Sequence, residues 1–110
     1  MWPPALSAHF MPGSPIVVVL NVDTPARVET WVDVELASPK GRKPIAKIVI
    51  PRNRWSYWNH SWRHEQRLLE MPSDVLQELG PAGLSLRASA QPGPVWLWRR
   101  APVTVVVPIG

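Results

Sequence analysis

Fourteen prolines and six glycines interrupt this chain of 110 residues every few positions. Proline lacks the backbone N–H that helices and central strands use for hydrogen bonding, and glycine weakens both kinds of element. The stretches between these residues permit short strands joined by turns and exclude long helices. This spacing of prolines and glycines therefore predicts an all-β fold.

Length and composition limit the chain further. A chain of this size is expected to form one domain with a single modest hydrophobic core. It contains no cysteine, so disulfides and thiolate metal sites are excluded. The first ten residues carry no lysine or arginine, and no apolar run is long enough to cross a bilayer. We expect a soluble protein without a signal peptide or a transmembrane segment.

The clearest strand pattern covers residues 27–37. Valines and leucine alternate there with charged residues and Trp31, which predicts a strand with one buried and one solvated face. Further strands are expected at residues 15–22, 43–50, 65–70, 84–90 and 95–107, the last interrupted at Pro102. Ser73 or Asp74 as an N-cap and Gly80 as a stop signal predict one short helix.

Residues 1–14 form a separate segment in this interpretation, and residues 15–110 form the folded domain. Prolines and a glycine in the first segment predict an extended N-terminal arm with no helix or strand of its own. Its apolar side chains favour an arm that docks on a neighbour. The expected contact residues are Trp2, Leu6, Phe10 and Met11.

The order of these elements indicates the architecture. About seven short strands, separated by turns every 8–12 residues or so, are typical of a single β-sandwich of the immunoglobulin or fibronectin type. A jelly roll is the competing arrangement. No cysteine pair brackets a strand tryptophan, so this expectation rests on the pattern alone.

Charge is distributed unevenly along the chain. Residues 1–39 hold one basic and four acidic side chains, whereas residues 40–67 hold eight basic and one acidic. A basic middle segment beside an acidic first third favours contact with an acidic partner, including another copy of the chain.

The seven tryptophans are the main functional signal, and five of them fall within residues 55–62 and 96–98. About three are expected to fill the core, drawn from Trp58, Trp62, Trp96 and Trp98, because each ring can bury roughly 150–250 Å². Residues 52–64 combine a helical spacing of tryptophans with polar residues typical of loops, and we favour a structured loop. The residues expected to bind a partner are Trp31, Arg52, Arg54, Trp55, Tyr57, Trp58, Trp98, Arg99 and Arg100.

Motifs for catalysis are weak. His60 and His64 have the spacing of two zinc ligands on a helix, but a third ligand is lacking. No serine lies in a glycine-flanked elbow, and Glu29, Asp33 and Glu35 suit a solvated strand face better than a pair of catalytic carboxylates. We therefore expect neither enzymatic activity nor a metal or cofactor.

These features favour a non-enzymatic structural or interaction protein. The specific hypothesis is a small accessory or decoration (cement) subunit that binds copies of itself and a larger protein assembly such as a virus capsid, which would place it in the virion. The alternative is a carbohydrate-binding module that uses exposed tryptophans. A third possibility is nucleic-acid binding through the basic, aromatic residues 52–67.

Overall fold

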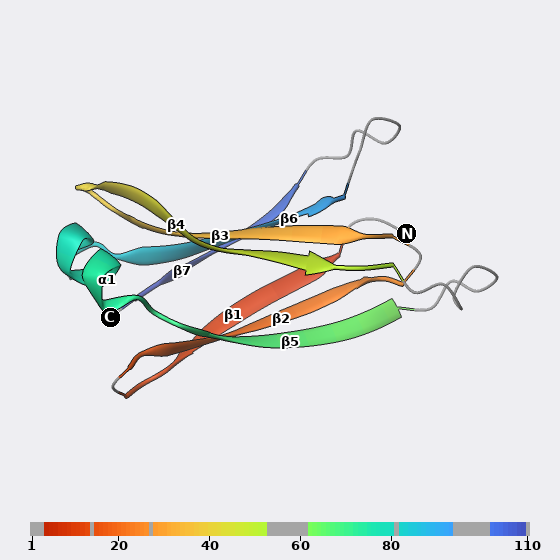
Figure 1. Ribbon diagram of the computed structural model, residues 1–110, viewed down its shortest axis with the longest axis horizontal. Coiled ribbons are helices and arrows are strands. Elements are labelled where there is room, and N and C mark those ends of the chain that lie inside the picture. The colour runs from red at the N-terminus through yellow and green to blue at the C-terminus, as the bar shows by residue number, and fades with distance from the viewer. Residues whose placement is uncertain are drawn as a thin grey trace.

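The computed structural model describes residues 4–13, 15–26, 28–52, 62–80, 82–93 and 102–109. In this part of the chain, two antiparallel sheets pack face to face with one short helix at one end (Figure 1). This arrangement confirms the predicted all-β sandwich. No helix among the described residues has the length and hydrophobicity that crossing a bilayer requires.

Seven strands make up the two sheets. The first sheet has the order β1-β2-β5 and contains β1 (Ala5–Met11), β2 (Val17–Pro25) and β5 (Trp62–Glu70). The second has the order β4-β3-β6-β7 and contains β3 (Thr30–Ser38), β4 (Gly41–Ile50), β6 (Ser85–Pro92) and β7 (Val103–Pro108). The first, second and fifth strands thus face the other four in a two-sheet sandwich. The described residues do not supply the eight strands of a jelly roll.

The core between the sheets is aliphatic. Alternate residues of the central strands turn inward, as the pattern in β3 predicted: Val32, Val34 and Leu36 are buried, while Asp33 between them is exposed. The remaining residues with almost no exposed surface in this core are Val18, Leu20, Val22, Ile50, Leu86, Ala88 and Ala90. Neither of the tryptophans that the structure describes contributes to it.

β1 corrects one expectation. Residues Ala5–Met11 pair with β2 from Ala5 opposite Asp23 to Met11 opposite Val17, so the prediction that residues 1–14 contain no strand is wrong for this stretch. Leu6 and Phe10 point toward the interior and pack against the core. Pairing with β2 provides hydrogen-bond partners for the backbone N–H and C=O groups of this segment, whose sequence has little strand propensity of its own.

The helix α1 (Ser73–Leu79) lies between β5 and β6 and agrees with the predicted position. It ends at Gly80, whose φ of 76° is a conformation that glycine adopts without strain. The expected N-cap is wrong: Pro72 occupies that position, and no side chain caps the helix. The carbonyl of Pro72 already accepts the first helical hydrogen bond, from the N–H of Leu76 at 3.1 Å.

Two further expectations concern the ends of strands. β5 begins at Trp62, three residues before the predicted start, and the rest of the ambiguous segment, residues 53–61, lies outside the described residues. The last strand begins at Val103, and residues 94–101 also lie outside the described part.

A pair of buried hydroxyl groups joins the two sheets at one end. Thr24, near the end of β2, and Thr30, at the start of β3, are both fully buried, and their Oγ1 atoms lie 2.5 Å apart. No buried polar side-chain atom in the described structure lacks a hydrogen-bond partner. Because neither side chain has exposed surface, each hydroxyl relies on the other for its hydrogen bond among the described residues.

We predict that Thr24→Val alone destabilises the fold by about 1 to 3 kcal/mol, because it leaves the Thr30 hydroxyl buried without a partner. The double change Thr24→Val with Thr30→Val should recover most of this loss, since both polar groups are then replaced by apolar groups of the same shape. Urea unfolding of the single and double variants measures the coupling. Additive losses would show that the two hydroxyls do not act as a pair.

Candidate functional site

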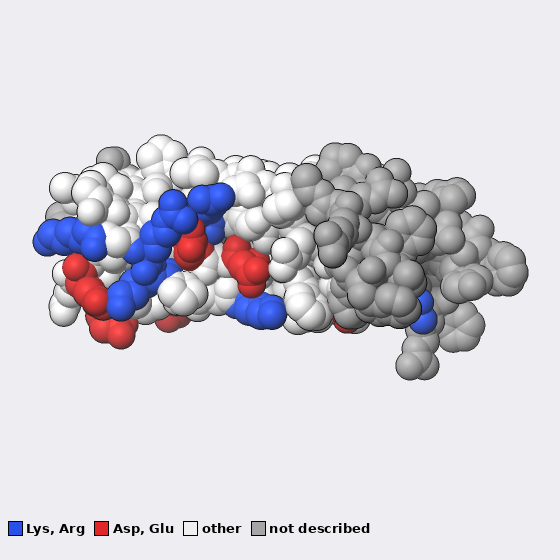
Figure 2. All heavy atoms as spheres, turned by 90° about the horizontal axis from the view of Figure 1, so that it is seen from above, with Lys and Arg blue, Asp and Glu red and all other residues white. Residues whose placement is uncertain are grey.

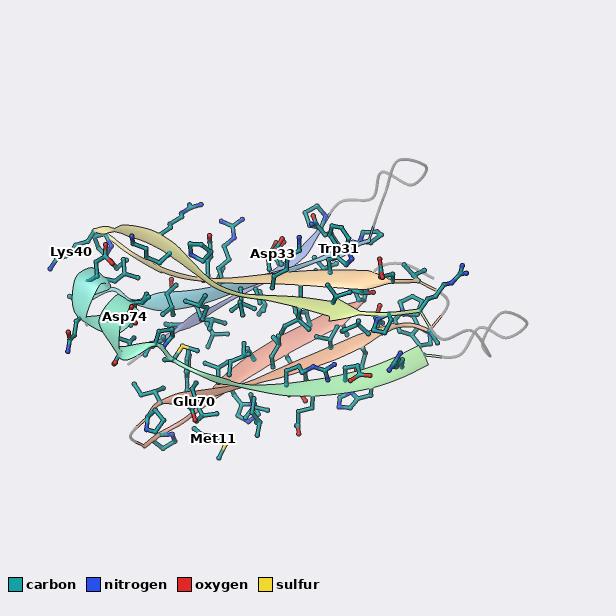
Figure 3. All side chains as sticks on the ribbon, in the orientation of Figure 1. Met11, Trp31, Asp33, Lys40, Glu70 and Asp74 are labelled. Carbon is teal, nitrogen blue, oxygen red and sulfur yellow. The ribbon has the colours of Figure 1, made fainter. Side chains whose placement is uncertain are left out.

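Trp31 lies on the outer face of β3, and residues from neighbouring strands fix its position. The indole Nε1 donates a hydrogen bond to the Glu29 carboxylate at 3.1 Å, and the Lys47 ammonium lies 4.4 Å from the ring centroid. The backbone N–H of Gly93 donates to the carbonyl of Glu29 at 2.7 Å, and a Cβ atom at Gly93 would lie only 2.6 Å from the Trp31 Nε1. The ring is therefore held in a single orientation, and Figure 3 shows Trp31 and Asp33 projecting from this face.

An open groove runs along the same outer face. Its volume is about 640 Å³, and the charged residues that line it are Asp33, Glu35, Arg42, Lys47 and Arg87. Figure 2, which views the molecule from the side of this sheet, shows basic and acidic side chains lying beside one another. This mixture of positive and negative side chains differs from the uniform positive charge expected of a phosphate-binding surface.

Trp62 lies on the surface of the molecule and not in the core, where it was expected. It begins β5 on the outer face of the first sheet and is 51% exposed, so the prediction that it fills the core is wrong. The alternate residues of β5 that turn inward are Arg63, Glu65, Arg67 and Leu69. Both faces of this strand are mainly polar in sequence, so the period-two pattern did not reveal which one would be buried.

The inward residues of β5 include a cluster of charges that sequence reasoning missed. Arg63 Nε and Arg67 Nη1 each lie 2.6 Å from a different oxygen of Glu65. Arg63 also donates to the carbonyl of Pro51 at 2.9 Å, which ties the end of β4 to β5. The hydrogen bond from Arg67, together with the charge of Arg63, lowers the pKa of the Glu65 carboxyl below its ordinary value. The spacing Arg-x-Glu-x-Arg, which places all three residues on one face of a strand, is the signal that could have identified it.

The outer face of the first sheet has a polar half and an apolar half. His64 Nδ1 is hydrogen bonded to the Asp23 carboxylate at 2.5 Å, and Gln66 donates to Asn21 at 3.1 Å. Beyond them the exposed apolar side chains are Leu68 and Met11, and Figure 3 shows Met11 pointing away from the molecule. His64 therefore has a local structural partner in Asp23, and no group of three metal-binding side chains exists among the described residues.

The predicted partner-binding residues are only partly visible. Arg52 is exposed just after β4, and Trp31 lies on the sheet face described above. The others lie outside the described residues: Arg54, Trp55, Tyr57, Trp58, Trp98, Arg99 and Arg100. Trp2, one of the predicted arm contacts, also lies outside them. Among the predicted arm contacts, Leu6 and Phe10 pack on the core of their own chain, and Met11 faces solvent.

Strand register places the two described tryptophans at the same end of the sandwich. Thr30 lies opposite both Ile50 and Pro92, and Pro25 lies opposite Trp62. β4 and β6 end, and β5 and β7 begin, at this end of the sandwich. Four more tryptophans, which lie outside the described residues, fall between these strands in the sequence: Trp55, Trp58, Trp96 and Trp98.

No protein-family model, curated protein sequence or solved structure is significantly similar to this chain.

We predict that Glu65→Gln destabilises the protein by about 1 to 2 kcal/mol at neutral pH, because both arginines lose a charged partner. The folded-state pKa of Glu65 is lowered, so its ionised form stabilises the fold above its ordinary pKa of about 4.5. This stabilisation is lost as the pH falls through the lower, folded-state pKa. Urea unfolding across acidic pH should therefore show a smaller acid-induced loss in Glu65→Gln than in the wild type.

Glu70→Gln is the matched control, since Glu70 ends the same strand on its exposed face. An equal change in pH dependence for both variants would contradict the assignment to the Glu65 cluster.

Proposed function

We propose that this chain is a non-enzymatic structural and interaction protein that binds a protein partner through exposed tryptophans. The observation that carries this proposal is that both described tryptophans lie on outer surfaces, while the core is aliphatic. The specific form that we favour is a small accessory or decoration subunit that binds and stabilises a larger assembly such as a virus capsid.

The physical argument rests on Trp62. Half of its large apolar side chain contacts water, and covering it by a partner is favourable in proportion to the area removed from solvent. Tryptophan and arginine are also the residues most enriched among those that dominate binding energy at protein interfaces. Arg52 is exposed near the same end of the sandwich, where β4 ends.

Trp62→Ser should weaken attachment to the assembly roughly thirtyfold, because a tryptophan at the centre of an interface contributes about 2 kcal/mol or more. Stability should change little, since the side chain is already half exposed. Density-gradient fractionation of lysate from the natural source, with tagged wild-type and variant protein, measures the distribution between large particles and free protein.

Leu68→Ser is the control, because Leu68 is an exposed apolar residue of the same strand and is 65% exposed. The wild type and this control should co-sediment with particles at a constant ratio, and Trp62→Ser should stay near the top of the gradient. Wild-type protein that is found only in the slow fractions would overturn the proposal.

Carbohydrate binding is the second candidate, and Trp31 is the observation that favours it. An indole held rigidly beside Glu29, Asp33 and an open groove could stack on a sugar ring while the carboxylates bind hydroxyl groups. The Lys47 ammonium lies over the indole ring, so a sugar would have to stack on the opposite face. Nucleic-acid binding by residues 52–67 has less support, because Arg63 and Arg67 share the Glu65 carboxylate in ion pairs within the chain.

If the second candidate is correct, a polysaccharide in an affinity-electrophoresis panel should retard the wild-type protein, and Trp31→Ala should abolish the retardation. Val49→Ala is the control, since Val49 pairs with Trp31 on the neighbouring strand and is 46% exposed. Retardation that persists in Trp31→Ala would exclude this site.

A further inference from the structure

β7 is an edge strand with one free side. It pairs with β6 only, and no other described residue is hydrogen bonded along its outer edge. The N–H of Ile109 donates to the carbonyl of Leu84 at 2.9 Å, so Ile109 points its backbone toward β6. Because hydrogen bonding alternates along an antiparallel strand, Thr104 and Val106 point their N–H and C=O groups toward the free side.

The prolines around β7 obey the same alternation. Pro102 and Pro108 fall at positions that face the free side, where their missing N–H removes no bond to β6. They stand three residues before and three residues after Val105 in the sequence. The free edge thus consists of two complete hydrogen-bonding residues, Thr104 and Val106, placed symmetrically about Val105.

The two edge strands on the opposite side of the sandwich carry features that hinder pairing. β4 contains Pro44 and carries lysine and arginine. Its pairing with β3 shifts by one residue between Val34 and Glu35 of β3, which leaves Ile45 of β4 as an extra residue. β5 carries inward charges at Arg63 and Glu65. Charged side chains of this kind protect sheet edges from other chains.

β7 lacks these protective charges. Five of its six residues are valine or threonine, which favour extended pairing, and none is charged. The outward side chain of Val106 is 58% exposed. β1, which lies beside β7 in the other sheet, is also uncharged, but it contains no β-branched residue.

We propose that two copies of this chain pair through β7, antiparallel and about a two-fold axis near Val105. Thr104 of one copy then lies opposite Val106 of the other, and the N–H and C=O groups of both residues find partners. A strand without charge meets its own copy without repulsion, which is why a second copy fits this edge. The pairing uses a different surface from Trp31 and Trp62, so it does not depend on the proposed function.

Val106→Pro tests the proposal, because it removes an N–H that faces the free side and leaves the bonds to β6 in place. Size-exclusion chromatography with light scattering over a concentration series should give the wild type a mass approaching twice 12.4 kDa. The variant loses the Val106 bond twice in a symmetric dimer, so its dissociation constant should rise roughly tenfold or more. Circular dichroism confirms that the variant remains folded.

Two variants serve as matched controls. Val106→Thr keeps the N–H and should dimerise like the wild type. Ala8→Pro removes a backbone N–H that faces the free side of β1. The N–H of Met71 donates to the carbonyl of Ile16, so the alternation along β2 and β1 points the backbone N–H of Ala8 away from β2. This variant should leave dimerisation unchanged. Hydrogen exchange gives a second readout, since the amides of Thr104 and Val106 should exchange more slowly as concentration rises.

Several results would overturn the proposal. The proposal is overturned if the wild-type protein is monomeric at all concentrations. Slow exchange of the Thr104 and Val106 amides would not rescue it. Loss of the dimer in Ala8→Pro but not in Val106→Pro would assign the interface to β1. Loss in Trp62→Ser alone would assign it to the tryptophan surface. If Val106→Pro does not fold, Val106→Lys, which places a charge on the exposed side chain, must weaken dimerisation in its place.

Discussion

Hydrogen bonding of the strand backbones is the constraint on which the rest of this structure depends. β2, β3 and β6 have a neighbour on each side, so both sides of their backbone must find partners. β2 and β6 contain proline only as their last residue, and β3 contains none. Pro44 and Pro108 belong to edge strands, where one side of the backbone has no neighbour. A proline-rich chain can form this sandwich because its prolines avoid the interior of the central strands.

The core follows from this arrangement. The three central strands place valine, leucine and alanine between the sheets, Ile50 of β4 joins them, and the interior that they form is filled by aliphatic side chains. The two described tryptophans lie outside it and differ from each other. Trp31 is held by Glu29, Lys47 and the backbone near Gly93, whereas Trp62 is exposed at the start of an edge strand. Trp31 is suited to a rigid contact, and burial of Trp62 by a partner would remove the larger apolar area from water.

The two lateral sides of the sandwich are also different. The side formed by β4 and β5 carries a proline, an extra residue at Ile45 and the Arg63, Glu65 and Arg67 cluster. The side formed by β1 and β7 carries no lysine, arginine, aspartate or glutamate. Since charge and irregular backbone hinder strand addition, contacts made by sheet extension are directed to the second side.

The sequence by itself determined the β class, the alternation of β3 and the end of the helix at Gly80. These features depend on local chemistry: the missing N–H of proline, the period of two along a strand and the positive φ of glycine. Tertiary structure decided that Ala5–Met11 is a strand, because β2 supplies its hydrogen bonds. It also decided which face of β5 turns inward, because both faces are similarly polar. The surface position of Trp62 and the clustering of Arg63, Glu65 and Arg67 follow from that choice, and so only the pairing of β5 with β2 fixed them.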